Sequence, residues 1–281
     1  MASVGFDGVS IGYDDVGPAT GGVGGTGAGD VVVLVHGHPF DRSMWAPQLA
    51  HLPGTGWRAV AADLRGYGES TVVPGAVTLD VFAGDIARLL DHLGVGAVVL
   101  AGLSMGGQIV MELLRLFPER VRGIVLADTS PVAETADGRR SRNAVADRLL
   151  AEGMTGYAEE LLPMMLAPGT IRDRRDVADH VSRMMSRTSP VGAAAALRGR
   201  AERPDYRSTL RRTTVPARVV VGTDDAYTSV EDARDTAALL PTGRLAVVHG
   251  AGHMPNLERP DEFNALLDEL LDVVRKEPHR A

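Results

Sequence analysis

The residues that could do chemistry begin with a serine set between glycines. Residues 102–106 read GLSMG, which is a G-x-S-x-G motif with Ser104 at its centre. A buried apolar strand at 97–101 leads into the motif, and a helix-like segment at 105–117 leads out of it. In this setting the serine lies on a tight strand-to-helix turn, and glycine is needed on both sides because larger residues would clash. Ser104 is therefore predicted to be a nucleophile, with a helix N-terminus favouring the negative charge that develops.

A serine hydroxyl needs a base that removes its proton, and His253 is predicted to be that base. It follows the last apolar strand, at 245–248, and loops that leave the carboxyl ends of parallel strands are where sites form in such sheets. His249 is nearer to this strand and is interpreted as a packing or surface residue. Four further histidines are in helix or tail contexts and are interpreted as solvated: His51, His92, His180 and His279.

The histidine in turn needs an acid that holds its tautomer, and position alone leaves three candidates. Asp224 and Asp225 follow the apolar strand at 217–221. Asp128 directly follows the strand at 123–127. The chain order serine, aspartate, histidine is the usual one for a G-x-S-x-G nucleophile, and all three aspartates satisfy it.

The elements that would position these residues follow an α/β pattern. Short apolar runs without polar alternation predict parallel strands buried on both faces, and helical periods lie between them. A hairpin around Asp7-Gly8 adds two strands, and a glycine-rich loop follows at 17–30. The prediction is a mostly parallel eight-stranded sheet flanked by helices. The central runs are 31–35, 59–62, 97–101, 123–127, 217–221 and 245–248, and the helices are 79–93, 105–117 and 260–275.

The alternation stops between about 131 and 214, where the chain is helix-like and strandless. We expect residues 1–131 and 215–281 to form the core, and 132–214 to form a helical lid inserted after the sixth strand. The predicted lid helices are 143–151, 157–166, 176–186 and 190–201. Five methionines of this segment fill a core or make an adaptable apolar pocket wall, and the second alternative favours an apolar substrate: Met154, Met164, Met165, Met184 and Met185.

Composition excludes several classes of function. The net charge of −7, with mixed signs along the chain, argues against a nucleic-acid partner. The chain has no cysteine, which rules out disulfides, thiolate nucleophiles and cysteine metal sites. Its only lysine, Lys276, lies near the C-terminus, so a Schiff-base lysine and a phosphate-binding G-K-[ST] loop are not expected. No secretory signal or membrane span is apparent, and a cytoplasmic protein with no membrane partner is expected.

Five motifs together carry a resemblance to a known family. They are HGHPFDRSMW at 36–45, DLRGYGES at 63–70, GLSMGG at 102–107, G-x-x-D at 222–225 and GAGHMPNLERP at 250–260. The sequence resembles the α/β-hydrolase fold family, in particular its cofactor-free haloperoxidases, esterases and enol-lactonases. The family usually has Thr-Pro after the G-x-x-D turn, whereas this chain has Thr228-Ser229.

The resemblance implies roles for individual residues. It favours Asp225 over Asp224 as the acid, and it implies that the backbone N–H groups of His38 and Met105 form an oxyanion hole. It also implies that Asp63 and Arg65 brace their loop. No cofactor is expected, and no metal site, since His36 and His38 have a chelating spacing but no third ligand in view.

The expected function is hydrolysis of an ester, thioester or lactone of a small to medium apolar substrate through Ser104, Asp225 and His253. The same triad could instead serve perhydrolysis, acyl transfer or carbon–carbon bond hydrolysis. A second alternative is a non-catalytic ligand-binding protein on the same fold. Epoxide and haloalkane hydrolysis are disfavoured, because relatives with those activities have an aspartate in place of Ser104. The partner is a small molecule, and assembly into a homo-oligomer is left open.

Overall fold

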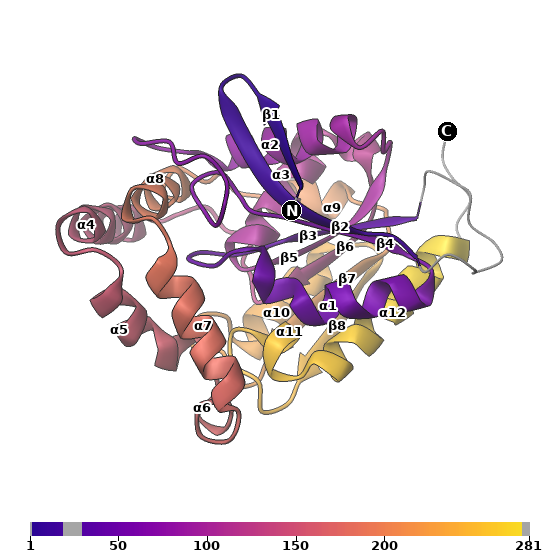
Figure 1. The fold of residues 1–281 in the computed structure, drawn as a ribbon. Coiled ribbons are helices and arrows are strands. Elements are labelled where there is room, and N and C mark those ends of the chain that lie inside the picture. The colour runs from indigo at the N-terminus through magenta and orange to yellow at the C-terminus, as the bar shows by residue number, and fades with distance from the viewer. Residues whose placement is uncertain (1, 19–29, 277–281) are drawn as a thin grey trace.

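The central element of the fold is an eight-stranded sheet (Figure 1). The structure is a computed structural model, and it describes residues 2–18 and 30–276. The strand order is β1-β2-β4-β3-β5-β6-β7-β8, and the prediction of a mostly parallel eight-stranded sheet is confirmed. Most of the glycine-rich loop predicted at 17–30 lies outside the described residues. The strands are β1 Ala2–Phe6, β2 Val9–Val16, β3 Val31–Val35, β4 Arg58–Ala62, β5 Val98–Leu103, β6 Val121–Ala127, β7 Ala217–Gly222 and β8 Gly243–Val248.

The direction of the strands brings the chemistry-bearing loops to one edge. Strands β1 and β2 form the predicted hairpin around Asp7-Gly8, and β2 pairs antiparallel with β4. From β4 to β8 every pairing is parallel. The loops after β5, β6, β7 and β8 therefore leave the same edge of the sheet, which is where parallel sheets place their sites.

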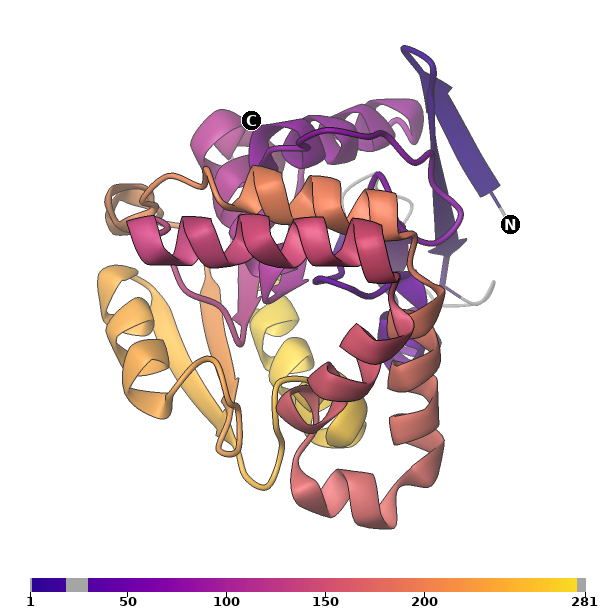
Figure 2. The ribbon, with the colours of Figure 1, turned by 90° about the vertical axis from the view of Figure 1, so that its left-hand side faces the viewer.

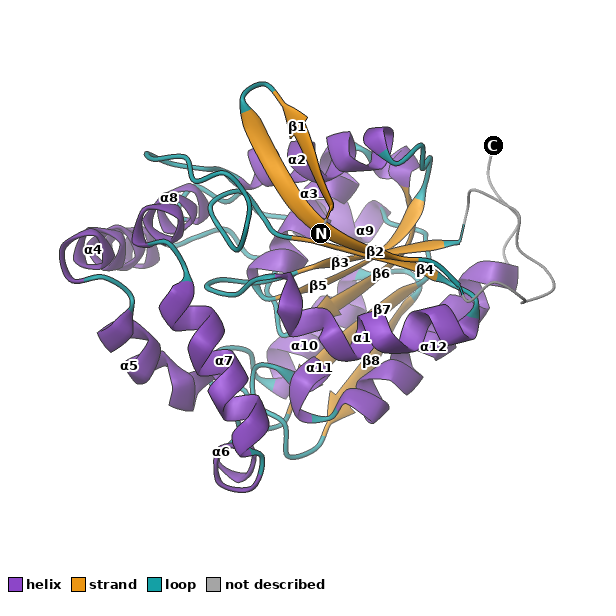
Figure 3. Ribbon diagram, viewed as in Figure 1, coloured by secondary structure: helices purple, strands orange, loops and turns teal. Residues whose placement is uncertain are grey.

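Helices cover both faces of this sheet, because the central strands are apolar on both sides (Figure 3). In β3 the alternation is visible residue by residue, since Val33 packs into the core on one face and Val32 into the core on the other. The first core includes side chains of α2, α3 and α10, and the second includes side chains of α12. The helices outside 132–214 are α1 Ala46–His51, α2 Leu79–His92, α3 Met105–Leu116, α10 Val230–Leu239, α11 Pro255–Glu258 and α12 Pro260–Lys276, with short 3₁₀ turns at Arg42–Trp45, Leu52–Thr55 and Pro118–Arg120.

Six helices lie between β6 and β7, and we call residues 132–214 the helical insertion. All four predicted helices are present. The one predicted at 143–151 begins seven residues earlier, the bounds of the other three differ by at most two residues, and α6 and α9 were not predicted. Figure 2 shows α4 and α8 running side by side, with a small core of their own that includes Leu149 and Leu197. The helices are α4 Ala136–Glu152, α5 Thr155–Met165, α6 Pro168–Asp173, α7 Arg175–Arg187, α8 Pro190–Arg200 and α9 Arg207–Arg212.

The insertion is joined to the rest of the chain by direct backbone contacts. The Val77 N–H donates to the carbonyl of Ala195 in α8 at 3.0 Å. At Gly192, a Cβ atom would lie 2.0 Å from the carbonyl oxygen of Gly66, so only glycine permits this approach. Helix α8 is therefore fixed on the loop that follows β4. In the described ranges of the chain, no helix has the length and apolar character needed to cross a membrane.

Candidate active site

Ser104 lies at the turn between β5 and α3, in a backbone conformation that is rare for a residue with a side chain. Its φ is 56° and its ψ is −115°, and its N–H donates to the Ala127 carbonyl at 2.9 Å. A Cβ atom on Gly102 would lie 2.3 Å from the Gly106 carbonyl oxygen, and one on Gly106 would lie 2.1 Å from that of Val35. The two glycines are therefore required for the turn that holds Ser104 above the sheet edge.

His253 and Asp225 are hydrogen-bonded to each other beneath the surface. His253 Nδ1 lies 2.9 Å from Asp225 Oδ1, and their side chains are 3% and 0% exposed. The same carboxylate oxygen accepts the Tyr227 N–H at 2.9 Å. Because a carboxylate only accepts, this contact assigns the proton of a neutral imidazole to Nδ1 and leaves Nε2 as an acceptor.

The three aspartates that were left open by position have different surroundings. Asp225 reaches His253, whereas Asp224 is exposed and, among the described residues, accepts only the Thr223 hydroxyl, at 3.0 Å. Asp128 is buried beside Asp225, and its Oδ1 accepts the Gly222 N–H at 3.0 Å. The structure thus brings together the histidine and the aspartate favoured by the family resemblance, with Asp128 as a close neighbour.

Asp128 differs from an ordinary aspartate in its ionisation. Burial, reinforced by the charge of Asp225, holds the pKa of Asp128 well above its usual range. The Oδ2 atoms of both aspartates are buried and have no hydrogen-bond partner in the described residues. Because the two carboxyl groups interact directly, a proton on Asp128 would remove the repulsion between two buried negative charges. Ligand atoms of Asp128, Asp225 and His253 also lie within 4.8 Å of one another, so these residues are the candidate set for a metal ion.

Both backbone N–H groups predicted to form the oxyanion hole are free to donate to a substrate. Within residues 2–18 and 30–276, neither the His38 N–H nor the Met105 N–H has a hydrogen-bond acceptor. Met105 is the first residue of α3, where N–H groups have no partner in their own helix. The His38 ring reaches the Tyr67 hydroxyl at 2.8 Å and the Tyr157 hydroxyl at 3.4 Å. Burial, with the charge of Arg200 next, holds the pKa of His38 well below its usual value.

His36, by contrast, is committed to structure. Its Nδ1 lies 2.8 Å from the Gly37 carbonyl and its Nε2 accepts the Leu64 N–H at 2.9 Å, so both ring nitrogens are used within the loops. Burial lowers the pKa of His36, which keeps it neutral. The pairing of His36 with His38 as metal ligands therefore has no support in the geometry.

Asp63 and Arg65 brace the loop after β4, as the family resemblance implies. Asp63 accepts the backbone N–H groups of Arg42 and Glu69, each at 2.8 Å, and also forms an ion pair with Arg42. Arg65 makes a two-pronged contact with Asp85, at 2.9 and 2.6 Å.

A cavity of about 220 Å³ lies over Ser104 and is lined by both the sheet edge and the helical insertion. The core contributes Ser104, His38 and His253, while Met165 is the one methionine of the predicted five in its wall. Met154, Met184 and Met185 are buried in packing and Met164 is largely exposed, so core filling explains most of the methionines. The expectation of an apolar pocket wall missed the residues that give this cavity its charge: Arg142, Arg200 and Arg203.

A buried glutamate, also missed in the sequence, supports the histidine loop. Glu258 Oε1 accepts the N–H groups of Gly252 and Met254 at 2.8 and 3.2 Å. Its Oε2 accepts the Ala167 N–H at 2.8 Å and the Thr170 hydroxyl at 2.7 Å. Glu258 thus joins the residues on both sides of His253 to the helical insertion. The GAGHMPNLERP motif contained it, but its role depends on partners far away in the sequence.

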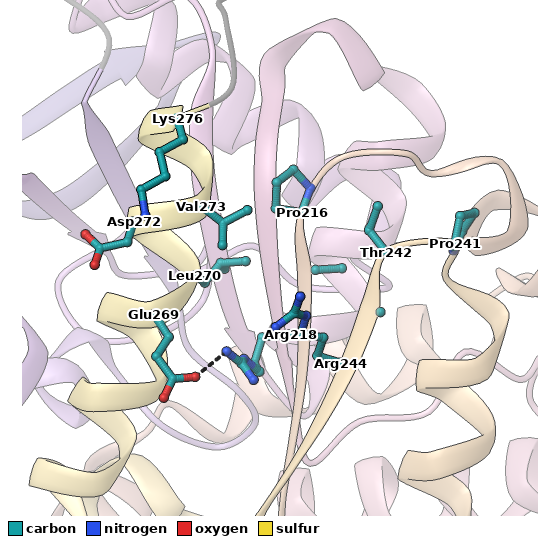
Figure 4. Close-up of a pocket in the computed structure, with 12 residues that line it drawn as sticks. Pro216, Arg218, Pro241, Thr242, Arg244, Glu269, Leu270, Asp272, Val273 and Lys276 are labelled. Carbon is teal, nitrogen blue, oxygen red and sulfur yellow. Dashed lines mark hydrogen bonds and ion pairs between the residues drawn. The ribbon is translucent and has the colours of Figure 1, made fainter.

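A larger cavity, of about 640 Å³, lies at the other edge of the sheet (Figure 4). It is lined by the first residues of β7 and β8 and by α12, and it contains the ion pair of Arg218 and Glu269, at 2.6 Å. Among the described residues, its lining includes neither a serine nor a histidine. The smaller cavity is therefore the candidate active site.

Comparisons with known proteins agree with this geometry. Residues 30–260 match the family described as alpha/beta hydrolase fold. The chain is 34% identical to a thermophilic esterase from Thermogutta terrifontis, solved with malate bound, with a TM-score of 0.89 and 97% of both chains covered. It is 26% identical to the enol-lactonase from Burkholderia xenovorans LB400, with a TM-score of 0.86 and coverage of 96% of this chain and 100% of that chain.

A curated relative gives the same result at the level of sequence. The chain is 29% identical to 3-oxoadipate enol-lactonase 2 of Acinetobacter baylyi, over 82% of this chain and 84% of that protein. The fold, the turn around Ser104 and these similarities have one common explanation. The chain belongs to the α/β-hydrolase fold family, in the branch of cofactor-free haloperoxidases, esterases and enol-lactonases, and it is a hydrolase-type enzyme.

Proposed function

We propose that this enzyme hydrolyses an ester, thioester or lactone through a triad of Ser104, His253 and Asp225. One observation carries the proposal: Ser104, on its constrained turn, faces the same cavity as His253, whose Nδ1 is held by Asp225. Within the described chain, Ser104 Oγ has no hydrogen-bond partner, and such contacts often tighten only when substrate binds.

In the first step, Ser104 Oγ attacks the carbonyl carbon while His253 Nε2 takes the hydroxyl proton. The carbonyl oxygen becomes negatively charged and accepts the N–H groups of His38 and Met105. Loss of a single donor of this kind costs about 3 kcal/mol of transition-state stabilisation. When the tetrahedral intermediate collapses, the carbon–oxygen bond breaks and His253 gives its proton to the leaving oxygen, which stays tethered if the substrate is a lactone.

In the second step, a water molecule hydrolyses the acyl-enzyme. His253 Nε2 takes a proton from this water, whose oxygen attacks the acyl carbon. The bond to Ser104 Oγ then breaks, and the proton returns to the serine as the acid leaves. Asp225 remains a carboxylate throughout and stabilises the imidazolium.

We assign the helical insertion the role of a lid over this site, with residues 1–131 and 215–281 as the catalytic core. Tyr157, Leu161 and Met165 of the insertion line the cavity. The Met165 carbonyl also accepts the His253 N–H at 3.0 Å, so the insertion contacts the base directly.

The decisive experiment is covalent labelling with a fluorophosphonate probe, together with turnover of a p-nitrophenyl ester. The wild type should be labelled at Ser104, and Ser104→Ala and His253→Ala should lose turnover. Equal labelling of wild type and Ser104→Ala would refute the proposal. Product analysis with added peroxide or alcohol separates hydrolysis from perhydrolysis and acyl transfer.

The three aspartates provide matched variants for the acid. Asp225→Asn should lower kcat by about 10³–10⁴-fold, because it places the wrong tautomer of histidine toward the serine. Asp224→Asn makes the same chemical change at the exposed neighbour and should stay close to wild type. Similar losses in both variants would contradict the assignment of Asp225.

A further inference from the structure

The helical insertion places three arginines in the wall of the cavity over Ser104. Arg142 comes from α4, Arg200 is the last residue of α8, and Arg203 follows it. They come from two separate segments of the chain, so their meeting is a property of the fold. An esterase site for purely apolar substrates would not require cationic groups here.

The charges of these arginines are incompletely balanced by the protein. Glu134 forms ion pairs with Arg142 and, at 2.7 Å, with Arg203. Arg203 Nε also donates to the Val132 carbonyl at 2.9 Å. Three guanidinium groups thus share one carboxylate, and the carboxylate of Asp225 lies fully buried behind His253.

Of the three arginines, Arg200 is the one without a carboxylate partner among the described residues. Its Nε donates to Gln108 Oε1 at 2.8 Å, and no carboxylate of the described residues pairs with it. Burial, with the like charges of Arg142 and Arg203, lowers the pKa of Arg200. A guanidinium has five N–H donors, and one neutral amide oxygen satisfies only one of them. An anion in the cavity would supply both the missing charge and the missing acceptors.

The position of Arg200 relative to the nucleophile limits what this anion could be. Gln108 is four residues after Ser104 on α3, and its N–H donates to the Ser104 carbonyl at 3.2 Å. Ser104, Gln108 and Arg200 also line the same cavity of about 220 Å³. The Arg200 guanidinium is therefore within reach of a group a few bonds away from a carbonyl carbon at Ser104.

We infer that this arginine wall is a subsite for a carboxylate, and that the substrate is an ester or lactone whose acyl part carries one free carboxylate. The planar fork of a guanidinium matches a carboxylate with two parallel hydrogen bonds. This inference rests on the proposed function and names its substrate class. It replaces the expectation of an apolar substrate with that of a monoanionic one, of a size that fits a cavity of about 220 Å³.

The test compares two substrates that differ mainly in this charge. One is the mono-p-nitrophenyl ester of glutaric acid, which is an anion at neutral pH, and the other is the same compound with its free carboxyl as a methyl ester. The wild type should prefer the anion in kcat/KM. In Arg200→Gln this preference should fall at least tenfold, and Arg200→Lys should recover part of it.

The matched control is Arg234→Gln, which removes the same charge from an exposed ion pair with Glu231 on α10. This variant should keep the wild-type preference. An equal fall in Arg234→Gln would show that net charge alone governs the preference, and it would overturn the subsite. The absence of any preference in the wild type would overturn it as well, while turnover of the neutral ester would leave the proposed function intact.

A binding measurement keeps the inference testable without turnover. Calorimetry with monomethyl glutarate and the Ser104→Ala protein should show binding that weakens at least tenfold when Arg200→Gln is added. If neither ester is hydrolysed, this measurement still decides the subsite, whereas the proposed function fails. Binding of methyl phosphate but not of monomethyl glutarate would overturn the carboxylate assignment.

Discussion

Replacement of Asp128 by asparagine should stabilise the protein, and by more as the pH rises. Asp128 is buried beside Asp225, which raises its pKa well above the usual value, so in the folded protein it keeps its proton at a pH where an unfolded chain has lost it. Asparagine is neutral at every pH and has nearly the same shape. Its oxygen can accept the Gly222 N–H, and its amide can donate to the unpartnered Oδ2 of Asp225.

The size and sign of the effect follow from proton linkage. Between the pKa of an unfolded aspartate, about 3.9, and the raised pKa in the fold, the native state binds one proton more than the unfolded state. In this window the stability contributed by Asp128 falls by about 1.4 kcal/mol for each unit of rising pH. Asparagine removes this loss. The two proteins should therefore be similar near pH 4 and diverge by about 1.4 kcal/mol per unit above it.

Urea unfolding at a series of pH values measures this difference. Trp45 and Trp57 are both buried, so tryptophan fluorescence reports the transition. Asp224→Asn is the matched control, because the same change at an exposed site should give no pH-dependent gain. A stability difference between Asp128→Asn and wild type that stays constant from pH 4 to pH 8 would refute a protonated Asp128.

Three further changes test other parts of the structure. Gly106→Ala should cost about 2–4 kcal/mol of unfolding free energy, because the new Cβ would meet the Val35 carbonyl. The control is Gly84→Ala on α2, where the Cβ would enter open space, and this variant should be neutral or stabilising in the same urea assay. Glu258→Gln should lose about 2–4 kcal/mol of unfolding free energy and have a lower kcat, because the new amide group would face two N–H or O–H donors. A variant with wild-type stability and kcat would show that Glu258 does not hold the His253 loop in place. Arg200→Gln should raise the unfolding free energy at pH 7 by on the order of 1 kcal/mol, because burial and the charges of Arg142 and Arg203 disfavour a cation at this position. A destabilised variant would contradict an excess of positive charge in this wall of the cavity.

Much of the fold was predictable because its signals are local. Each central strand is a short apolar run, and the structure has a strand at every predicted run, with ends shifted by at most two residues. The turn around Ser104 was predictable for the same reason, since a strand, two glycines and a helix are contiguous. The helices α1, α6, α9 and α11 were not predicted, because they have only four to six residues, too few to show a period. The ten-residue helix α10 was not predicted either.

The site was predictable only in part. Sequence position left Asp128, Asp224 and Asp225 equivalent, and the family resemblance preferred Asp225. The geometry separates them, because side-chain direction at a turn depends on backbone dihedrals that residue order does not reveal. The role of Glu258 was likewise hidden, since its four donors come from two segments that are distant in sequence, 167–170 and 252–254.

The sequence by itself determined the strand–helix alternation, the turn around Ser104 and the loop that carries His253, because each depends on neighbouring residues. Only the tertiary structure decided which aspartate meets His253, that Asp128 is buried against it, and that Arg142, Arg200 and Arg203 share one cavity. The arginines of the insertion look unremarkable along the chain. Their electrostatic effect arises when α4 and α8 pack side by side over Ser104, because charge–charge interactions depend on distance in space and on burial.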